Sequence, residues 1–258
     1  MESTLTSTKD TSPKPKLIDQ PTYQPQSARG VSRMWNSSIG IKIIVAITGG
    51  LLLLFVIGHL LGNLQVFLGQ DALNAYGEKL RVFPALLWVV RLGLLAVAVL
   101  HVTFTIRLAL LNNAARPVAY SRKQAIKATL SSRTMVVTGL TVLAFILYHL
   151  MHFTFRVTNP AYQTLIDAHG RFDVYSMVVM GFQNVYISGT YIIAMLLLGY
   201  HLNHGIASVF QTIGWNTPRT QPFYERLAFV VASLIVIGNI SIPVSILAGI
   251  VTLPGGGM

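Results

Sequence analysis

Cysteine is absent from this sequence, and acidic residues are scarce in it. Because none of the 258 residues is cysteine, disulfides, iron–sulfur clusters and thiolate metal sites on this chain are excluded. Asp and Glu number only 8, and all of them lie outside the long apolar stretches, in the N-terminal region, in predicted loops or at predicted helix ends. A metal site inside those stretches would therefore have to use ligands other than carboxylates.

Charged residues of both signs are few. They make up 10% of the chain against 53% hydrophobic residues, whereas an ordinary soluble domain has about 25% charged residues. A helix that crosses a bilayer needs about 20 mainly apolar residues. Five stretches meet this requirement: Gly40–Leu68, Pro84–Leu111, Met135–Phe155, Val185–Ile213 and Leu227–Leu253. We therefore predict an all-α fold, an integral membrane bundle of five transmembrane helices within residues 36–258.

The first 35 residues form a separate region. They contain four prolines among Ser, Thr and Lys, and no apolar run that could act as a cleavable signal. A segment of this composition cannot bury enough apolar surface to fold by itself. We predict a flexible cytoplasmic arm over residues 1–35.

The net charge of +11 is distributed unevenly over the two sides of the predicted bundle. The arm and the loops on its side hold fourteen Lys and Arg, and the other side holds five: Lys79, Arg81, Arg91, Arg156 and Arg171. Since loops rich in Lys and Arg stay in the cytoplasm, we predict a cytoplasmic N-terminus. The basic side either serves topology and anionic lipids alone or also docks a soluble partner. We predict no nucleic-acid partner.

Four histidines lie one in each of four consecutive apolar stretches, at His59, His101, His149 and His201. Successive helices run in opposite directions, so His59 and His149 fall in the outer half of the membrane. His101 and His201 fall in the inner half. At about 1.5 Å rise per residue, the two levels differ by about 10 Å along the membrane normal. This separation suits two macrocycles in electron-transfer contact, with one histidine pair at each level.

Other interpretations of these histidines remain open. A single histidine inside a membrane is more often a hydrogen-bonded core residue than a ligand, and copper or zinc could also bind imidazole. Imidazole is, however, a common axial ligand of haem iron, and four histidines at two levels favour two haems. The alternative function is a metal-ion transporter lined by histidines.

An internal repeat distinguishes between two histidines of the third stretch, His149 and His152. Thr48-Gly49, Phe55, His59 and Leu60 correspond in spacing to Thr138-Gly139, Phe145, His149 and Leu150. His152 has no counterpart, because Gly62 stands at that place in the first copy. The repeat therefore predicts that His149 is the ligand.

The order and spacing of these motifs resemble the five-helix dihaem cytochrome b (b558-type) subunit of succinate:quinone oxidoreductases, the succinate dehydrogenases and fumarate reductases. The resemblance covers nearly all of residues 35–253. It rests on the two Thr-Gly…His segments, on His101 followed by Arg107, and on His201-Leu202-Asn203-His204-Gly205. In the family the ligand stands four residues before this glycine, which favours His201 over His204.

The resemblance implies a membrane anchor that binds two b haems and transfers electrons between an iron–sulfur subunit and quinone. The expected partners are that iron–sulfur subunit, a flavoprotein subunit and the lipid bilayer, and the expected location is the bacterial cytoplasmic membrane. The chain would be the quinone-reactive part of an enzyme, without a dicarboxylate site of its own. His101 and His201 would ligate the proximal haem, near the iron–sulfur subunit, and His59 and His149 the distal haem.

The resemblance also suggests menaquinone as the quinone. We expect it on the outer side, because a second haem is needed only if electrons cross most of the membrane. The polar candidates there are Glu78, Arg91 and His152. Each has a simpler alternative role: Glu78 as a solvated loop residue, Arg91 reaching toward the lipid headgroups, and His152 bonded to a haem propionate. Some fumarate-reducing members have a glutamate two residues before the fourth ligand, and this chain has Gly199 there, so their proton path is not expected.

Overall fold

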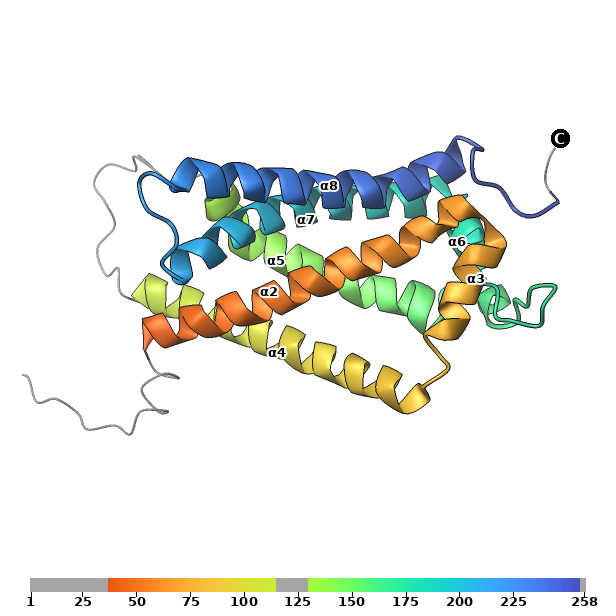
Figure 1. Ribbon diagram of the computed structural model, residues 1–258, viewed down its shortest axis with the longest axis horizontal. Coiled ribbons are helices and arrows are strands. Elements are labelled where there is room, and N and C mark those ends of the chain that lie inside the picture. Colours follow the sequence, from red (N-terminus) through yellow and green to blue (C-terminus); the bar gives the residue numbers. More distant parts are fainter. Residues whose placement is uncertain (1–36, 115–129, 256–258) are drawn as a thin grey trace, which may run out of the picture.

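The computed structural model describes residues 37–114 and 130–255, and all structural statements below concern these residues. The predicted arm at residues 1–35 and the basic loop at residues 115–129 lie outside them. Five long helices make up most of the described chain: α2 (Ser38–Asn63), α4 (Pro84–Ala114), α5 (Leu130–His149), α7 (Val185–Thr212) and α8 (Gln221–Leu247). Each is long and apolar enough to cross a membrane, which confirms the predicted all-α membrane bundle (Figure 1).

The last helix differs from its predicted bounds. α8 begins at Gln221 and ends at Leu247, earlier at both ends than the predicted Leu227–Leu253. Pro222 lies in its first turn, where a missing backbone N–H breaks no helical hydrogen bond. Gly249 has a φ of 71°, a left-handed conformation that turns the chain out of the helix. Glu225, predicted to precede the helix, therefore lies within it.

Shorter helical segments gather at one end of the bundle, which we call the α3–α6 end (Figure 1). They are η1 (Leu64–Leu68), α3 (Gln70–Lys79), η3 (Pro160–Gln163) and α6 (Val174–Phe182). These segments were predicted to be membrane-spanning residues or loops. The prediction that Glu78 lies in a loop is wrong, because Glu78 lies on α3. In addition, α5 continues into a π-helical turn, η2 (Leu150–Thr154).

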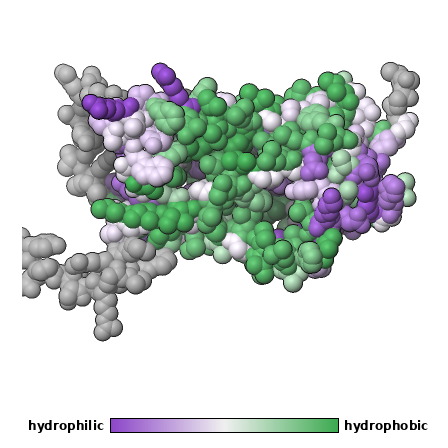
Figure 2. Space-filling view, in the orientation of Figure 1, coloured by the Kyte–Doolittle hydropathy of each residue, from purple (hydrophilic) through white to green (hydrophobic). Residues whose placement is uncertain are grey.

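The sides of the long helices expose apolar residues. In α4, none of the 18 residues of its most apolar window is buried. Green, apolar residues cover the middle of the molecule in Figure 2, and polar residues gather toward its two ends. An apolar surface of this extent fits a lipid bilayer and not water. The chain is therefore a multi-pass membrane protein.

The helix packing places two pairs of helices diagonally opposite each other. α2 packs against α4 and α7, α5 packs against α7, and α8 covers α7 and α2. α2 and α5 therefore lie on different sides of α7, and α4 and α7 lie on different sides of α2. The best-buried apolar cluster lies near the α3–α6 end and consists of Val66, Leu73, Tyr175, Val179, Phe182, Tyr191, Ile242, Ile246 and Val251.

Candidate functional site

His59 of α2 and His149 of α5 face each other near the α3–α6 end. Their ring centroids are 5.8 Å apart, and the rings are nearly perpendicular, at 86°. Phe55 stacks on His59 with ring centroids 5.4 Å apart, and Phe145 lies 6.0 Å from His149. In both copies of the repeat, the phenylalanine four residues earlier thus supports the histidine ring one helical turn away.

His101 of α4 and His201 of α7 form a second pair with similar geometry. Their ring centroids are 6.5 Å apart, with an angle of 75° between the rings. Each pair joins helices that lie diagonally opposite in the bundle, so both pairs span its interior. These pairs are the ones expected from the depths of the histidines along their helices.

The spacing of the rings fits a metal macrocycle between them. With metal–nitrogen bonds of about 2 Å, two imidazoles on opposite faces of one metal have ring centres roughly 6 Å apart. The observed distances of 5.8 Å and 6.5 Å lie on either side of this value. Ligand sites between facing helices of a bundle are a common arrangement. The ring spacing of both pairs therefore fits haem ligation, which itself stays a prediction.

A hydrogen bond from Nδ1 to Thr48 leaves the other ring nitrogen of His101 available. Thr48 Oγ1 donates to the Ile44 carbonyl at 2.7 Å and lies 3.1 Å from His101 Nδ1. Because the hydroxyl proton goes to Ile44, His101 Nδ1–H is the donor to Thr48 Oγ1. A neutral imidazole with its proton on Nδ1 has its lone pair on Nε2. Metal-bound histidines typically have such a partner on the second nitrogen.

The glycines of the repeat lie against the histidines of the other pair. A Cβ atom at Gly49 would be 3.1 Å from Cε1 of His101, and one at Gly139 would be 3.2 Å from Cε1 of His201. Such contacts are tighter than normal, so glycine lets each histidine approach the neighbouring helix. The spacing of Thr-Gly along the sequence does not predict this contact, because the glycine and the histidine lie on different helices.

Models of protein families, curated proteins and solved structures give no match to this chain.

The two alternative histidines have other partners. His204 Nε2 lies 3.2 Å from Ser208 Oγ on its own helix, whereas His201 faces His101. His152 is 1% exposed, and its Nδ1 lies 2.9 Å from the hydroxyl of Tyr191. In the described part of the chain, no group of three or more His, Asp or Glu is placed to hold a metal ion. The histidines thus occur in facing pairs.

The three quinone candidates have different surroundings. Glu78 lines a cavity of about 190 Å³ together with Asn74, Arg81, Arg171 and Phe172. The guanidinium of Arg91 lies 5.3 Å from the ring centre of Trp88 on the same helix. His152 is buried among aromatic rings and does not line that cavity.

Basic side chains surround the cavity beside Glu78. Arg81 and Arg156 both approach the ring of Phe172, at 5.2 Å and 4.4 Å from its centre. Burial lowers the pKa of the Arg81 guanidinium, and the charges of Arg156 and Arg91 lower it further. The cavity therefore combines one carboxylate with several cations.

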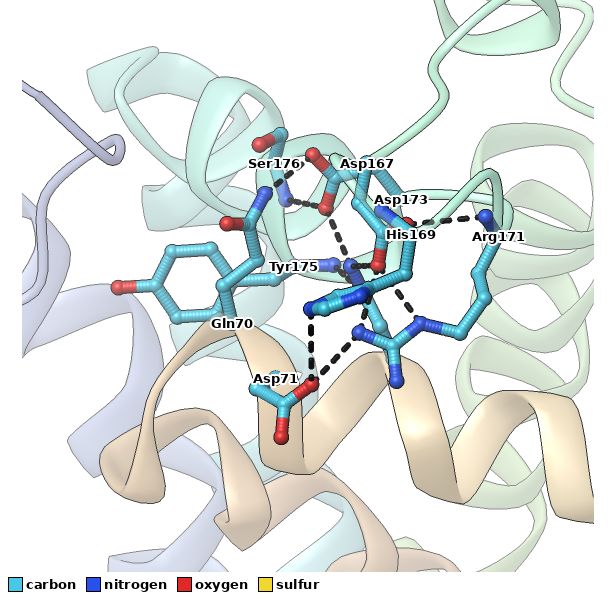
Figure 3. Close-up of polar contacts among 9 residues, drawn as sticks. Gln70, Asp71, Asp167, His169, Arg171, Asp173, Tyr175 and Ser176 are labelled. Atoms are coloured by element: carbon cyan, nitrogen blue, oxygen red, sulfur yellow. Dashed lines mark hydrogen bonds and ion pairs between the residues drawn. The ribbon is translucent and has the colours of Figure 1, made fainter.

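A buried polar cluster joins α3 to the segment that leads into α6 (Figure 3). Asn74, 1% exposed, donates to Asp167 and Asp173, both at 3.0 Å, and accepts from the backbone N–H of Tyr175 at 3.0 Å. Arg171 bonds Asp167 at 2.8 Å and Asp71 at 2.7 Å. No sequence pattern predicts this cluster, because its members come from segments about 100 residues apart. It fixes the end of the bundle next to His59 and His149.

Proposed function

We propose that this chain is the membrane anchor and electron-transfer subunit of a succinate:quinone oxidoreductase, a succinate dehydrogenase or fumarate reductase. Two b haems would be held by His59 with His149 and by His101 with His201. The observation that carries this proposal is the presence of two facing imidazole pairs, at two levels, built from four different helices. A bare metal ion would more commonly use three or four ligands at one level.

The residues of the chain hold and orient the cofactors. Thr48 fixes the orientation of His101 through Nδ1 and leaves Nε2 of His101 available as a ligand. Gly49 and Gly139 leave room for the histidines of the adjacent helices. When bound, the haems supply one-electron redox centres at levels about 10 Å apart along the helices. Electron transfer across most of the membrane would follow from this arrangement.

The distribution of charge supports the proposed orientation and partners. The α3–α6 end has five Lys and Arg, namely Lys79, Arg81, Arg91, Arg156 and Arg171. The opposite end and the segments connected to it have fourteen, among them Lys42, Arg107, Arg219 and Arg226. The end of a membrane protein that is richer in Lys and Arg faces the cytoplasm. The end opposite the α3–α6 end would therefore meet the iron–sulfur and flavoprotein subunits in the cytoplasm. The proposed location is the bacterial cytoplasmic membrane, and His101–His201 would be the proximal pair.

Quinone, proposed to be menaquinone, would react at the α3–α6 end beside the distal pair. The cavity with Glu78 supports this place, because a carboxylate there can accept a proton when quinol is oxidised. Glu78→Gln keeps the size of the side chain and removes this acceptor, so we expect quinone-dependent turnover to fall at least about tenfold with both haems retained.

Glu225→Gln, on α8 at the opposite end, is the matched control and should keep full activity. Loss of activity in Glu225→Gln, with normal activity in Glu78→Gln, would show that the quinone reacts at the opposite end and that its proposed place is wrong.

The decisive test is the reduced-minus-oxidised absorption spectrum of the gently solubilised protein, with haem and flavin measured per chain. We expect two b haems, and co-purification of a flavin-containing and an iron–sulfur subunit. A colourless protein would reject the proposal and favour the histidine-lined metal-ion transporter. Haem retained by a lone chain from native membranes would reject the respiratory complex.

A further inference from the structure

Tyr191 of α7 occupies a position between His149 and His152. Its hydroxyl lies 2.9 Å from Nδ1 of His152 and 3.4 Å from Nδ1 of His149. Both histidines belong to the end of α5 and its π-helical turn, Leu150–Thr154, whereas Tyr191 comes from the neighbouring helix. One hydroxyl group therefore contacts both histidines across a helix interface. π-Helical turns are frequent at functional sites.

Aromatic packing holds the ring of Tyr191 in place independently of its hydroxyl. The ring is 6% exposed and meets Phe145 and Phe182 edge to face, each with ring centroids 4.9 Å apart. Phe153 lies 5.8 Å away. Since these contacts involve only the ring, a phenylalanine at this position would keep the packing and lose only the hydroxyl.

We propose that Tyr191 is a positioning residue for the distal haem ligand, linking His149 to His152 through a directed chain of hydrogen bonds. This inference rests on the proposed function. If His149 binds iron through Nε2, its proton is on Nδ1, and Nδ1–H donates to the Tyr191 oxygen. The Tyr191 O–H then donates to Nδ1 of His152.

The directed chain has a consequence for His152. With Nδ1 accepting, His152 carries its proton on Nε2, a buried atom that has no hydrogen-bond partner among the described groups. A buried network that serves stability alone normally satisfies all its members. We therefore assign His152 to the end of the hydrogen-bond chain that begins at His149, the distal ligand.

A hydrogen-bond acceptor at Nδ1 makes the imidazole of His149 more basic, and a more basic axial ligand favours the oxidised iron. Removing the Tyr191 hydroxyl should therefore raise the midpoint potential of the distal haem. The proximal haem lies beside His101 and His201, and its potential should stay unchanged. The low-spin electron paramagnetic resonance signal of the distal haem should change with its potential.

The experiment compares Tyr191→Phe with Tyr148→Phe in the intact complex. Tyr148 belongs to the same aromatic cluster, stacking on His152 and meeting Tyr191 through its ring. We expect both variants to keep two haems, and only Tyr191→Phe to shift the distal potential upward. An unchanged distal potential in Tyr191→Phe, or an equal shift in both variants, would overturn the inference.

A double-mutant cycle tests the link to His152. His152→Phe should alter the distal potential in the wild-type background and leave it unchanged in Tyr191→Phe, because the hydroxyl that connects His152 to His149 is then missing. Additive shifts would overturn the proposed chain. Absence of haem from the unmutated complex would reject the proposed function instead.

Discussion

An imidazole inside a lipid-embedded bundle is unfavourable unless its nitrogens have partners, so each paired histidine requires an explanation. If the pairs bind haem, replacing one histidine by alanine removes an axial ligand. We expect each of the four variants, His59→Ala, His101→Ala, His149→Ala and His201→Ala, to lose one of the two haems. Members of a pair should lose the same haem, as measured by haem content and by reduced-minus-oxidised spectra.

Two other histidines provide controls for this prediction. His204→Ala removes a histidine one turn from His201 that is bonded to Ser208, and it should keep both haems. His152→Ala should also keep both. If His149→Ala kept both haems while His152→Ala lost the distal one, the internal repeat would have selected the wrong ligand.

Gly49 provides a second test at the residue scale. A side chain there would meet His101, 3.1 Å from its first carbon, whereas a Cβ atom at the next residue, Gly50, would meet nothing within 4 Å. Gly49→Val should displace His101 and reduce the occupancy or change the spectrum of the proximal haem. Gly50→Val is a matched control and should change neither. Equal effects of both variants on the proximal haem would show that the close approach at Gly49 is unimportant.

The facing of the histidine rings could be predicted from sequence, but the partners of their Nδ1 atoms could not. The regular rise of a helix and the alternation of direction assign each histidine a depth, and equal depths imply opposed rings. Thr48 lies 53 residues from His101, and Tyr191 lies 42 residues from His149. No local period relates such positions, because the contacts depend on how the helices are rotated about their axes.

At the scale of elements, Asn74 joins α3 to the segment that leads into α6. Asn74→Ala would remove two hydrogen bonds to carboxylates and leave a buried backbone N–H of Tyr175 unpaired, so we expect a loss of about 1–3 kcal/mol of stability. Hydrogen exchange of α3 amides and thermal unfolding would measure it. Asp71→Asn, at a side chain that is 79% exposed, should have little effect. A larger loss of stability in Asp71→Asn than in Asn74→Ala would contradict this role of Asn74.

The same attachment should weaken in acid. Burial opposes ionisation of Asp173, but hydrogen bonds from Ser176, Asn74 and Gln70 outweigh it and hold the pKa of this carboxyl below its ordinary value. A carboxyl whose pKa is lowered by folding stabilises the fold above the unfolded pKa of about 4, and this contribution is lost as the pH falls through the folded value. We expect the protection of α3 amides, relative to their intrinsic exchange rates, to fall only below about pH 4, and Asn74→Ala to reduce this dependence. A loss of protection already at neutral pH would contradict this explanation.

The long helices could be predicted because each exceeds the length of a bilayer crossing, whereas α3 and α6 could not. α3 has 10 residues and α6 has 9, too few to form stable helices alone, so their stability comes from tertiary contacts. Of the two, only α6 has a cap that is visible in the sequence: the side chain of Asp173 accepts from the Ser176 N–H at its start, whereas α3 follows Gly69, which has no side chain that could cap it.

At the scale of the whole molecule, the two ends of the bundle differ in charge. Four of the eight acidic residues of the chain lie at the α3–α6 end, and the basic loops are connected to the other end. Because fourteen Lys and Arg lie on the side of the other end against five at the α3–α6 end, we propose that the α3–α6 end faces away from the cytoplasm. The proposed places of the proximal haem, the soluble partners and the quinone all depend on this orientation.

The absence of cysteine makes the orientation directly testable, since any introduced cysteine would be the only thiol of the chain. His169, whose side chain is 68% exposed, lies at the α3–α6 end, and Pro218 lies exposed between α7 and α8 at the other. In spheroplasts, a membrane-impermeant maleimide should label His169→Cys at once, and Pro218→Cys only after the membrane is permeabilised. If only Pro218→Cys were labelled before permeabilisation, the orientation would be the inverse of the one proposed. The soluble partners and the pair His101–His201 would then lie on opposite sides of the membrane, and the assignment of this pair to the proximal haem would be wrong.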